Sequence, residues 1–231
     1  MILMVPLMIE TFAKKLEDVK DLPEKVVKEA VFGSQFHTIC SGGAYLNPDY
    51  IELFERFGIQ ILQGYGMTEC SPVISTTVAW NVKKNSVGQL LPNCEAKTVD
   101  GELWVRGSSV MQGYYKMPEE TKTALKDGWL CTGDLGYVDE ERFIYLTGRK
   151  KNLIITKNGE NVSPEELENK LSSSRLVQEV LVREAKGVIE AEIYPDEEYA
   201  KKQGLEREEE VRVELQKLID EYNQGAPAYK K

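Results

Sequence analysis

The segment Gln63-Gly64-Tyr65-Gly66-Met67-Thr68-Glu69 combines side chains that could bind a nucleotide. Two glycines around an aromatic residue at the end of a predicted strand let the backbone approach a flat ligand, on which Tyr65 could stack. Thr68 could donate a hydrogen bond to a phosphate oxygen. Glu69 could bind Mg²⁺, which prefers carboxylate and phosphate oxygens. A glycine-rich turn with an incidental Thr-Glu pair also explains these seven residues, so their meaning depends on the rest of the chain.

The composition is typical of a soluble globular protein with an acidic balance. Hydrophobic residues make up 42% and charged residues 29% of the 231 positions, and 29 Lys and Arg against 38 Asp and Glu give a net charge of −9. Non-specific nucleic-acid binding depends on clustered Lys and Arg, so no nucleic-acid partner is predicted. An anionic ligand would have to be held by local groups rather than by the overall field.

The four cysteines, Cys40, Cys70, Cys94 and Cys131, are scattered without a CxxC spacing, and His37 is the single histidine. This spacing argues against a zinc site and against a disulfide framework in a chain of this length. We expect four mostly buried thiols in a reducing, cytoplasmic setting. His37 precedes a glycine-rich turn and is interpreted as structural rather than catalytic.

The first nine residues, 1–9, are apolar but too short to span a bilayer, which takes about 20 residues. They also lack the basic start and the small-residue cleavage site of a signal peptide. We expect a buried strand or turn that belongs to a larger domain. No other segment approaches a membrane span in the sequence, and peripheral contact with a membrane surface stays open.

The chain divides into three regions with different sequence patterns. Residues 1–71 have the strand, turn and helix rhythm of an α/β sheet. The elements expected there are two helices within 7–32 separated at Pro23, a strand at 36–40, a helix capped by Asn47 with Pro48 at its first position and ended by Gly58, and a strand at 59–63 that breaks at Gly64. Residues 72–148 are β-rich, with strands near 101–106 and 142–147 and a small helix at 118–125.

Residues 149–231 predict a small α+β domain that follows a hinge near 148–152. Asn158-Gly159 suits the tight turn of a hairpin, and Ser163 and Glu166 have the spacing of a capping box around Pro164. Two strands are expected near 177–183 and 187–194. A last helix would bury one stripe of side chains, formed by Val211, Leu215, Leu218, Ile219 and Tyr222.

Five motifs in one order resemble the adenylate-forming superfamily, which includes acyl-CoA synthetases, coumarate ligases, luciferases and peptide-synthetase adenylation domains. The motifs are Ser41-Gly-Gly-Ala-Tyr-Leu46, Gly64-Tyr-Gly-Met-Thr-Glu69, Gly101-Glu-Leu-Trp-Val-Arg-Gly107 with Met111-Gln-Gly-Tyr-Tyr115, Trp129-Leu-Cys-Thr-Gly-Asp134, and Gly148-Arg-Lys-Lys-Asn152 with Lys157-Asn-Gly-Glu-Asn-Val-Ser-Pro164. The resemblance implies that 1–148 is the end of a large α/β nucleotide-binding domain with a β-rich subdomain, and that 149–231 is a mobile small α+β domain.

The resemblance also implies a role for each matching residue. Gly43 and Ala44 would lie beside adenine, and Gln63, Gly64 and Tyr65 would complete the AMP or ATP site with Thr68 and Glu69 as catalytic residues and Glu69 as the metal ligand. Asp134 would accept hydrogen bonds from the ribose hydroxyls, Arg149 would contact ribose or phosphate, Lys151 would be the hinge residue, and Lys157 and Gly159 would line the coenzyme A channel. Taken singly, these residues also fit a turn aspartate, a surface ion pair, solvated lysines and an ordinary Asn-Gly turn.

The implied reaction joins a carboxylic acid, most closely a fatty acid, to coenzyme A with ATP and Mg²⁺. Two alternatives stay open: a ligase that loads a carrier protein, and a non-catalytic nucleotide-binding or partner-binding remnant. The resemblance calls for an upstream phosphate-binding loop and for a lysine in a Gly-Lys setting that closes on the α-phosphate. Residues 1–40 hold no such loop, and Lys230 and Lys231 lack that setting. We therefore expect a C-terminal fragment that cannot form an adenylate alone.

Overall fold

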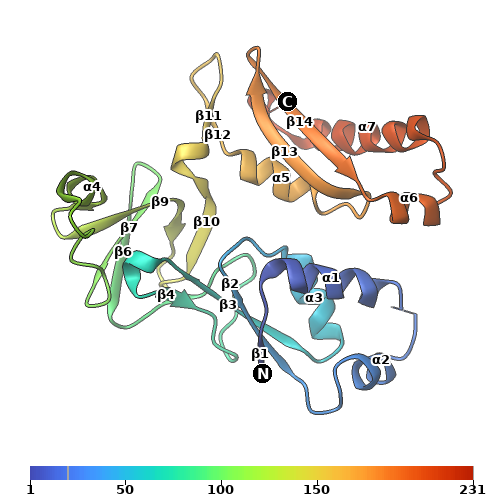
Figure 1. The fold of residues 1–231 in the computed structure, drawn as a ribbon, viewed down its shortest axis with the longest axis horizontal. Helices are drawn as coiled ribbons and strands as arrows, with labels where there is room; N and C mark the ends of the chain where they lie inside the picture. Colours follow the sequence, from blue (N-terminus) through green and yellow to red (C-terminus); the bar gives the residue numbers. More distant parts are fainter. Residues whose placement is uncertain (20, 231) are drawn as a thin grey trace. The chain divides into compact units, whose positions relative to one another are not determined.

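The computed structural model describes residues 1–19 and 21–230 and divides the chain into two compact units, Met1–Leu146 and Thr147–Lys231. The boundary falls inside strand β10 (Ile144–Arg149). Unit 1 contains two hydrophobic clusters of buried residues, and unit 2 contains a third. Figure 1 shows the elements of both units in sequence colours.

The first sheet of unit 1 has five strands in the order β1-β2-β3-β4-β5. β1 and β3 pair with β2 in parallel, whereas β4 pairs antiparallel with β3 and β5 antiparallel with β4. The bounds are β1 (Ile2–Leu3), β2 (Thr38–Gly42), β3 (Gln60–Gly66), β4 (Val73–Thr76) and β5 (Gln89–Leu90), with helices α1 (Pro6–Glu17), α2 (Glu24–Val31) and α3 (Pro48–Arg56) and the short 3₁₀ helix η1 (Thr68–Cys70). The α/β class predicted for this region is confirmed.

Local sequence explains the helices of unit 1. α1 begins with Pro6, and its buried residues include Ile9, Ala13 and Leu16, whose spacing of three and four positions forms one apolar face. At the start of α3 the Asn47 side chain accepts a hydrogen bond from the Asp49 backbone N–H at 2.9 Å, as its predicted capping role requires. Both predicted helix positions, before and after Pro23, are also confirmed.

Two predictions for the first sheet were wrong in part. The apolar start does form a strand, but β1 is the outermost strand in the sheet order, and its Ile2 and Leu3 side chains are 43% and 81% exposed rather than buried. The strand expected to break at Gly64 instead continues through Tyr65 to Gly66. It continues because β2 pairs with β3 as far as Gly64, and β4 takes up the pairing from there.

The second sheet of unit 1 has the order β10-β9-β7-β6, in which β7 pairs antiparallel with β6 and with β9, and β8 also pairs antiparallel with β9. The bounds are β6 (Cys94–Val99), β7 (Glu102–Gly107), β8 (Leu125–Lys126) and β9 (Trp129–Val138), with helix α4 (Pro118–Ala124). Its inner face carries Leu103, Val105, Leu130 and Ile144, which share one cluster with Tyr65 and Ile74 of the first sheet. The β-rich texture and the small helix were predicted correctly.

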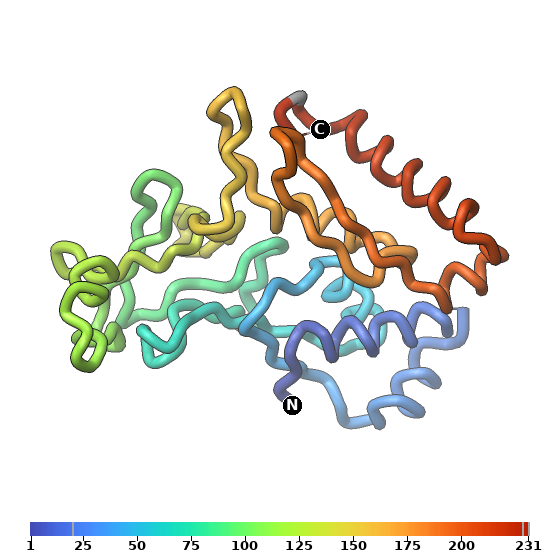
Figure 2. The backbone as a smooth tube through the Cα atoms, turned by 45° about the horizontal axis from the view of Figure 1, so that its top comes forward, coloured from blue at the N-terminus to red at the C-terminus, as the bar shows by residue number. Residues whose placement is uncertain are grey.

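Unit 2 contains two short hairpins and three α-helices within its described residues. The bounds are η2 (Lys150–Asn152), β11 (Ile154–Ile155), β12 (Asn161–Val162), α5 (Pro164–Leu171), β13 (Val177–Ala185), β14 (Val188–Pro195), α6 (Glu197–Lys202), α7 (Glu208–Gly225) and η3 (Ala228–Lys230). Ile154, Val162, Leu167 and Val182 form its core, and Tyr222 of α7 packs against them. Figure 2 shows the β13–β14 hairpin in orange and α7 in red along the same unit.

Ser163 is the N-cap of α5 and Pro164 its first residue, as predicted, but the predicted capping-box hydrogen bonds are wrong. The Ser163 hydroxyl donates to Glu165 Oε2 at 2.7 Å, and among the described residues no backbone N–H of α5 bonds to the Ser163 side chain. The hairpin turn also differs from the expected two-residue turn. Gly159 has a φ of +80°, whereas Asn158 is not among the described residues with a positive φ. The Thr156 N–H donates to Glu160 O at 2.9 Å, so three residues, 157–159, form the turn.

The thiols and the membrane question have plain outcomes. All four cysteines are free thiols, with Cys70 and Cys94 buried and Cys40 and Cys131 half-buried, so only two match the predicted burial. Burial, with smaller contributions from Cys94 and Glu69, raises the pKa of Cys70 to about 12. Within residues 1–19 and 21–230, no helix has the length and apolar character needed to cross a membrane.

Candidate active site

A buried hydrogen bond joins the two motifs that were predicted to hold a nucleotide. Tyr65 Oη, at the end of β3, donates to Asp134 Oδ2 of β9 at 2.6 Å, across 69 positions of sequence. Tyr65 is 9% and Asp134 6% exposed. The bond connects the first sheet of unit 1 to the second, because β3 and β9 belong to different sheets. The aromatic residue and the carboxylate therefore occupy one place in the fold.

The backbone around Asp134 is fixed by its neighbours on β7 and β9. Residues 130, 132, 134 and 136 of β9 are all buried, as the period of two along a strand requires. Thr132 Oγ1 donates to Leu103 O at 2.7 Å and accepts from the Asp134 backbone N–H at 3.1 Å. The Gly133 N–H donates to Glu102 Oε1 at 2.9 Å. These bonds limit the positions that the Asp134 carboxylate can take.

The glycine-rich turn after β2 lies beside the end of β3. The parallel register places Ser41 opposite Gln63 and Gly42 opposite Gly64. A Cβ added to Gly42 would lie 2.7 Å from Gly64 O, so a side chain at Gly42 would push the strands apart. The exposed residues Gly43 and Ala44 follow at once. The parallel pairing of β2 and β3 thus ends at Gly42 and Gly64, and open α/β sheets commonly bind ligands at the carboxyl ends of such strands.

Gln63 and Thr68 lie on either side of this strand end. Gln63 is half-buried, and its Nε2 donates to Ser86 O at 3.3 Å. Thr68 begins η1 and is exposed. Its role toward a phosphate stays a prediction.

Glu69 is bound by the segment that follows β7. Tyr114 Oη donates to Glu69 Oε1 at 2.8 Å, and the Met111 N–H donates to Glu69 O at 2.7 Å. The hydrogen bond to Glu69, helped by burial and by the charge of Glu69, raises the pKa of the Tyr114 phenol. Sequence reasoning did not single out Tyr114. The only available signal was its place in the Met111–Tyr115 motif, which does not say what the ring contacts.

The carboxylate of Glu69 suits Mg²⁺ only in a particular way. The described residues contain no group of three or more His, Cys, Asp and Glu side chains that could hold a metal ion by themselves. Magnesium in nucleotide sites commonly uses one or two carboxylates together with substrate phosphates and water. A carboxylate offers about four lone-pair positions, so the bond from Tyr114 leaves Glu69 able to bind a cation. The residues present fit a metal that arrives with its nucleotide.

The predicted hinge segment is tied to the first turn of α5 within unit 2. A Cβ added to Gly148, whose φ is +151°, would lie 2.1 Å from Ser163 Oγ. The Glu165 carboxylate accepts from Ser163 and from Asn152 Nδ2. Burial favours the neutral acid, but these two hydrogen bonds and backbone N–H groups outweigh it and hold the pKa of Glu165 below its ordinary value. Arg149 and Lys151, on this segment, are exposed.

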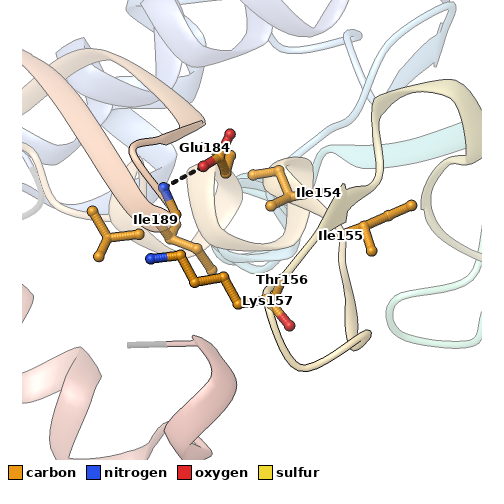
Figure 3. A pocket seen from close by; sticks show the side chains of 8 residues that line it. Ile154, Ile155, Thr156, Lys157, Glu184 and Ile189 are labelled. Carbon is orange, nitrogen blue, oxygen red and sulfur yellow. Dashed lines mark hydrogen bonds between the residues drawn. The ribbon is translucent and has the colours of Figure 1, made fainter.

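Lys157 and Gly159 lie on the turn between β11 and β12. Lys157 Nζ donates to Lys186 O at 3.4 Å, and a Cβ at Gly187 would overlap the Lys157 side chain. Figure 3 shows the lysine extended beside Ile189 along a pocket of about 240 Å³. The pocket is lined by Ile154, Ile155, Thr156, Lys157, Glu184, Gly187, Val188 and Ile189. The Lys157 ammonium is thus held at the β13–β14 turn, while Gly159 is exposed at the tip.

Unit 1 therefore contains Gly43, Ala44, Gln63, Gly64, Tyr65, Thr68, Glu69 and Asp134, and unit 2 contains Arg149, Lys151, Lys157 and Gly159. The register of β2 and β3 places the glycine-rich turn beside Gln63 and Gly64, and a hydrogen bond joins the next residue, Tyr65, to Asp134. The roles of all twelve residues toward ligands remain predictions.

Two sequence profiles together match most of the chain and leave residues 116–150 between them. One, described as AMP-binding enzyme, covers residues 1–115, and the other, described as AMP-binding enzyme C-terminal domain, covers residues 151–231. The chain belongs to the AMP-binding, adenylate-forming enzyme family. The resemblance inferred from five motifs is confirmed, and so is the fold class.

Curated relatives are acid–thiol ligases. The chain is 39% identical over 171 residues to long-chain-fatty-acid–CoA ligase FadD15 of Mycobacterium bovis, covering 73% of this chain and 28% of the relative. It is 41% identical over 165 residues to 4-coumarate–CoA ligase-like 4 of rice, covering 64% of this chain and 30% of the relative. The chain thus spans less than a third of the length of these relatives.

Solved structures extend the likeness to the fold. o-Succinylbenzoate CoA synthetase from Bacillus subtilis, in complex with its acyl-adenylate intermediate, superposes with a TM-score of 0.75 at 28% identity, over 99% of this chain and 45% of that one. The same synthetase in complex with ATP and magnesium ion gives a TM-score of 0.66 at 32% identity, over 83% of this chain and 40% of that one.

Proposed function

We propose that this chain is part of an AMP-forming acyl-CoA ligase, in which unit 1 supplies the adenosine side of the active site. The observation that carries the proposal is the buried bond between Tyr65 and Asp134. The bond joins an aromatic ring and a carboxylate, and Tyr65 directly follows Gly64, which is paired with Gly42 of β2. The close approach of these two glycines supports a site in which backbone rather than side chains would meet the ligand. A flat base and a diol are the two parts of adenosine that such groups recognise.

The proposed reaction has two steps. A carboxylate oxygen attacks the α-phosphorus of ATP, and pyrophosphate leaves with the bonding electron pair. The coenzyme A thiol, after losing its proton, attacks the acyl carbon of the adenylate, and AMP leaves. Magnesium bound with the nucleotide would supply charge neutralisation at the phosphates.

The described residues contribute mainly positioning and electrostatic stabilisation. Asp134 accepts hydrogen bonds from the ribose hydroxyls, and Thr68 donates to a phosphate oxygen. Glu69 is the carboxylate that would hold the metal. In unit 2, Arg149 would contact ribose or phosphate, and Lys151 would be the hinge residue.

Lys157 and Gly159 would line the path of coenzyme A. The Lys157 ammonium donates a long hydrogen bond, of 3.4 Å, to the Lys186 carbonyl. Such a bond is easily exchanged for an anionic group, which supports the proposed role.

A fatty acid is the proposed acyl substrate. Support comes from the relatives named long-chain-fatty-acid–CoA ligases, at 39% identity in Mycobacterium bovis and 38% in Bacillus subtilis. The test is acyl-CoA formation by the protein expressed from the whole reading frame that encodes this chain, with palmitate, benzoate and an amino acid as substrates. Turnover of benzoate or the amino acid in preference to palmitate would reject the fatty-acid assignment.

Nucleotide binding by the chain itself tests the core of the proposal. Isothermal titration with AMP should show binding by the wild type and at least a tenfold loss in Asp134→Asn, since hydrogen bonds to a charged group are worth about 1.5–3 kcal/mol. Glu140→Gln is the matched control, because Glu140 is acidic, near in sequence and exposed. Equal AMP affinity of the wild type and a folded Asp134→Asn protein would refute the proposal. So would a wild-type chain that binds no AMP at the highest concentration tested.

A further inference from the structure

Tyr114 contacts Glu69 from the segment that connects β7 to α4. The phenol of Tyr114 donates to Glu69 Oε1 at 2.8 Å, across 45 positions of sequence. Three residues earlier on the same segment, the Met111 N–H donates to the main-chain carbonyl of Glu69 at 2.7 Å. The segment therefore holds both the backbone and the carboxylate of one acidic residue.

The Tyr114 segment is itself fixed by α4. The Tyr114 backbone N–H donates to Thr121 Oγ1 at 2.9 Å, and the same hydroxyl donates to Met117 O at 2.7 Å. Gly113 has a φ of +151°, and a Cβ there would lie 2.8 Å from Thr121 Cγ2. Because the backbone of Tyr114 is anchored in this way, its ring reaches Glu69 from a defined direction.

We propose that Tyr114 is a positioning residue for metal-bound nucleotide: it binds one carboxylate oxygen of Glu69 and thereby turns the other toward the cation. The inference rests on the proposed function, since it requires that Glu69 meets a metal that arrives with ATP. The phenol must stay protonated to donate. A tyrosine phenol ordinarily has a pKa of about 10, so it carries its proton in the neutral range.

Binding measurements separate this role from a merely structural one. The affinity of the 231-residue chain for ATP is measured by titration calorimetry once in EDTA and once with Mn²⁺, and bound Mn²⁺ is followed by electron paramagnetic resonance. The manganese term is the ratio of the two affinities. Tyr114→Phe should leave the EDTA affinity within about twofold and reduce the manganese term roughly threefold to tenfold, as expected for the loss of one hydrogen bond at a half-buried site.

The neighbouring residue provides a matched control. Tyr115 is 85% exposed, so Tyr115→Phe should leave both affinities unchanged. Glu69→Gln should also lose the manganese term, and adding Tyr114→Phe to it should cause no further loss, because the two residues act through one contact. A further loss in the double variant would show that Tyr114 acts independently of Glu69.

Three further results would overturn the inference. Unchanged affinities of Tyr114→Phe in both EDTA and Mn²⁺ would show that the hydrogen bond does not orient Glu69. Equal losses of affinity in EDTA and in Mn²⁺, which leave the manganese term unchanged, would assign Tyr114 a structural role. The absence of ATP binding in the wild type would refute the proposed function together with the inference, whereas the first two results leave the proposed function intact.

Discussion

Replacing Tyr65 with phenylalanine removes one hydroxyl from the junction of the two sheets of unit 1 and keeps the ring. The ring remains in the cluster formed with Ile74, Leu103 and Leu130, so packing changes little. What is lost is the 2.6 Å hydrogen bond to the buried Asp134 carboxylate. Hydrogen bonds to charged groups contribute about 1.5–3 kcal/mol, which sets the expected loss in the free energy of unfolding.

The assay is urea unfolding followed by tryptophan fluorescence. All three tryptophans, Trp80, Trp104 and Trp129, lie in unit 1, so the signal reports on that unit. With an m value of about 2 kcal/mol per M, a loss of about 2 kcal/mol lowers the unfolding midpoint by about 1 M. Tyr115→Phe removes a hydroxyl from an exposed ring and should change the midpoint little.

A double-mutant cycle of Tyr65→Phe and Asp134→Asn isolates the contact from other effects. We expect a coupling energy of about 1–2 kcal/mol, because the two residues touch directly. A Tyr65→Phe protein whose unfolding free energy lies within about 0.5 kcal/mol of the wild type would refute the reasoning. Such a result would mean that the Tyr65 hydroxyl gains no more from Asp134 in the folded protein than from water in the unfolded chain.

Two further predictions concern Gly42 and Glu165. Gly42→Ala should destabilise unit 1 by about 1–3 kcal/mol in the same urea assay, because the added Cβ would lie 2.7 Å from Gly64 O. Gly64→Ala should cost far less, because its Cβ would lie 3.7 Å from the nearest atom, so equal losses in the two variants would contradict the reasoning. Glu165 should ionise below 4.5 in a carbon-detected NMR titration, and Ser163→Ala should raise its pKa. Since the pKa of Glu165 is lower in the folded state, its stabilisation is fully present above the pKa of the unfolded chain and is lost as the pH falls through the pKa of the folded state. A titration of Glu165 at or above 4.5 would reject the assignment.

Elements fixed by neighbouring residues were predictable from the sequence. The Asn47 cap needs only its own side chain and an N–H two positions on, and it formed as expected. At Ser163 the N-cap position was predicted correctly but the capping hydrogen bonds were not, since the hydroxyl is oriented toward Glu165, to which it donates. Glu165 in turn binds Asn152, which lies outside the local window. A capping signal is reliable only where no stronger partner for the hydroxyl is near.

Contacts between distant segments were not predictable in detail. Tyr65 and Asp134 were each expected to face a nucleotide, but nothing in the sequence indicated a bond between residues 69 positions apart. The extension of β3 past Gly64 has the same origin, since β4 supplies a pairing partner that strand propensity does not include. Tyr114 was missed because its contact with Glu69 depends on how Thr121 of α4 fixes the Tyr114 backbone, which the sequence does not show.

If Asp134 binds ribose as proposed, its hydrogen bond with Tyr65 links ligand binding to the stability of unit 1. A variant that loses AMP affinity could have lost a ligand contact or the junction between sheets, and affinity alone does not separate these causes. Linkage does: a ligand at ten times its Kd stabilises the folded state by about 1.4 kcal/mol. If Asp134 binds ribose, the fluorescence-detected stability of wild-type unit 1 rises with AMP, and Asp134→Asn abolishes that rise. Tyr65→Phe, by contrast, lowers the starting stability and keeps the AMP-dependent increment, because its carboxylate partner remains in place.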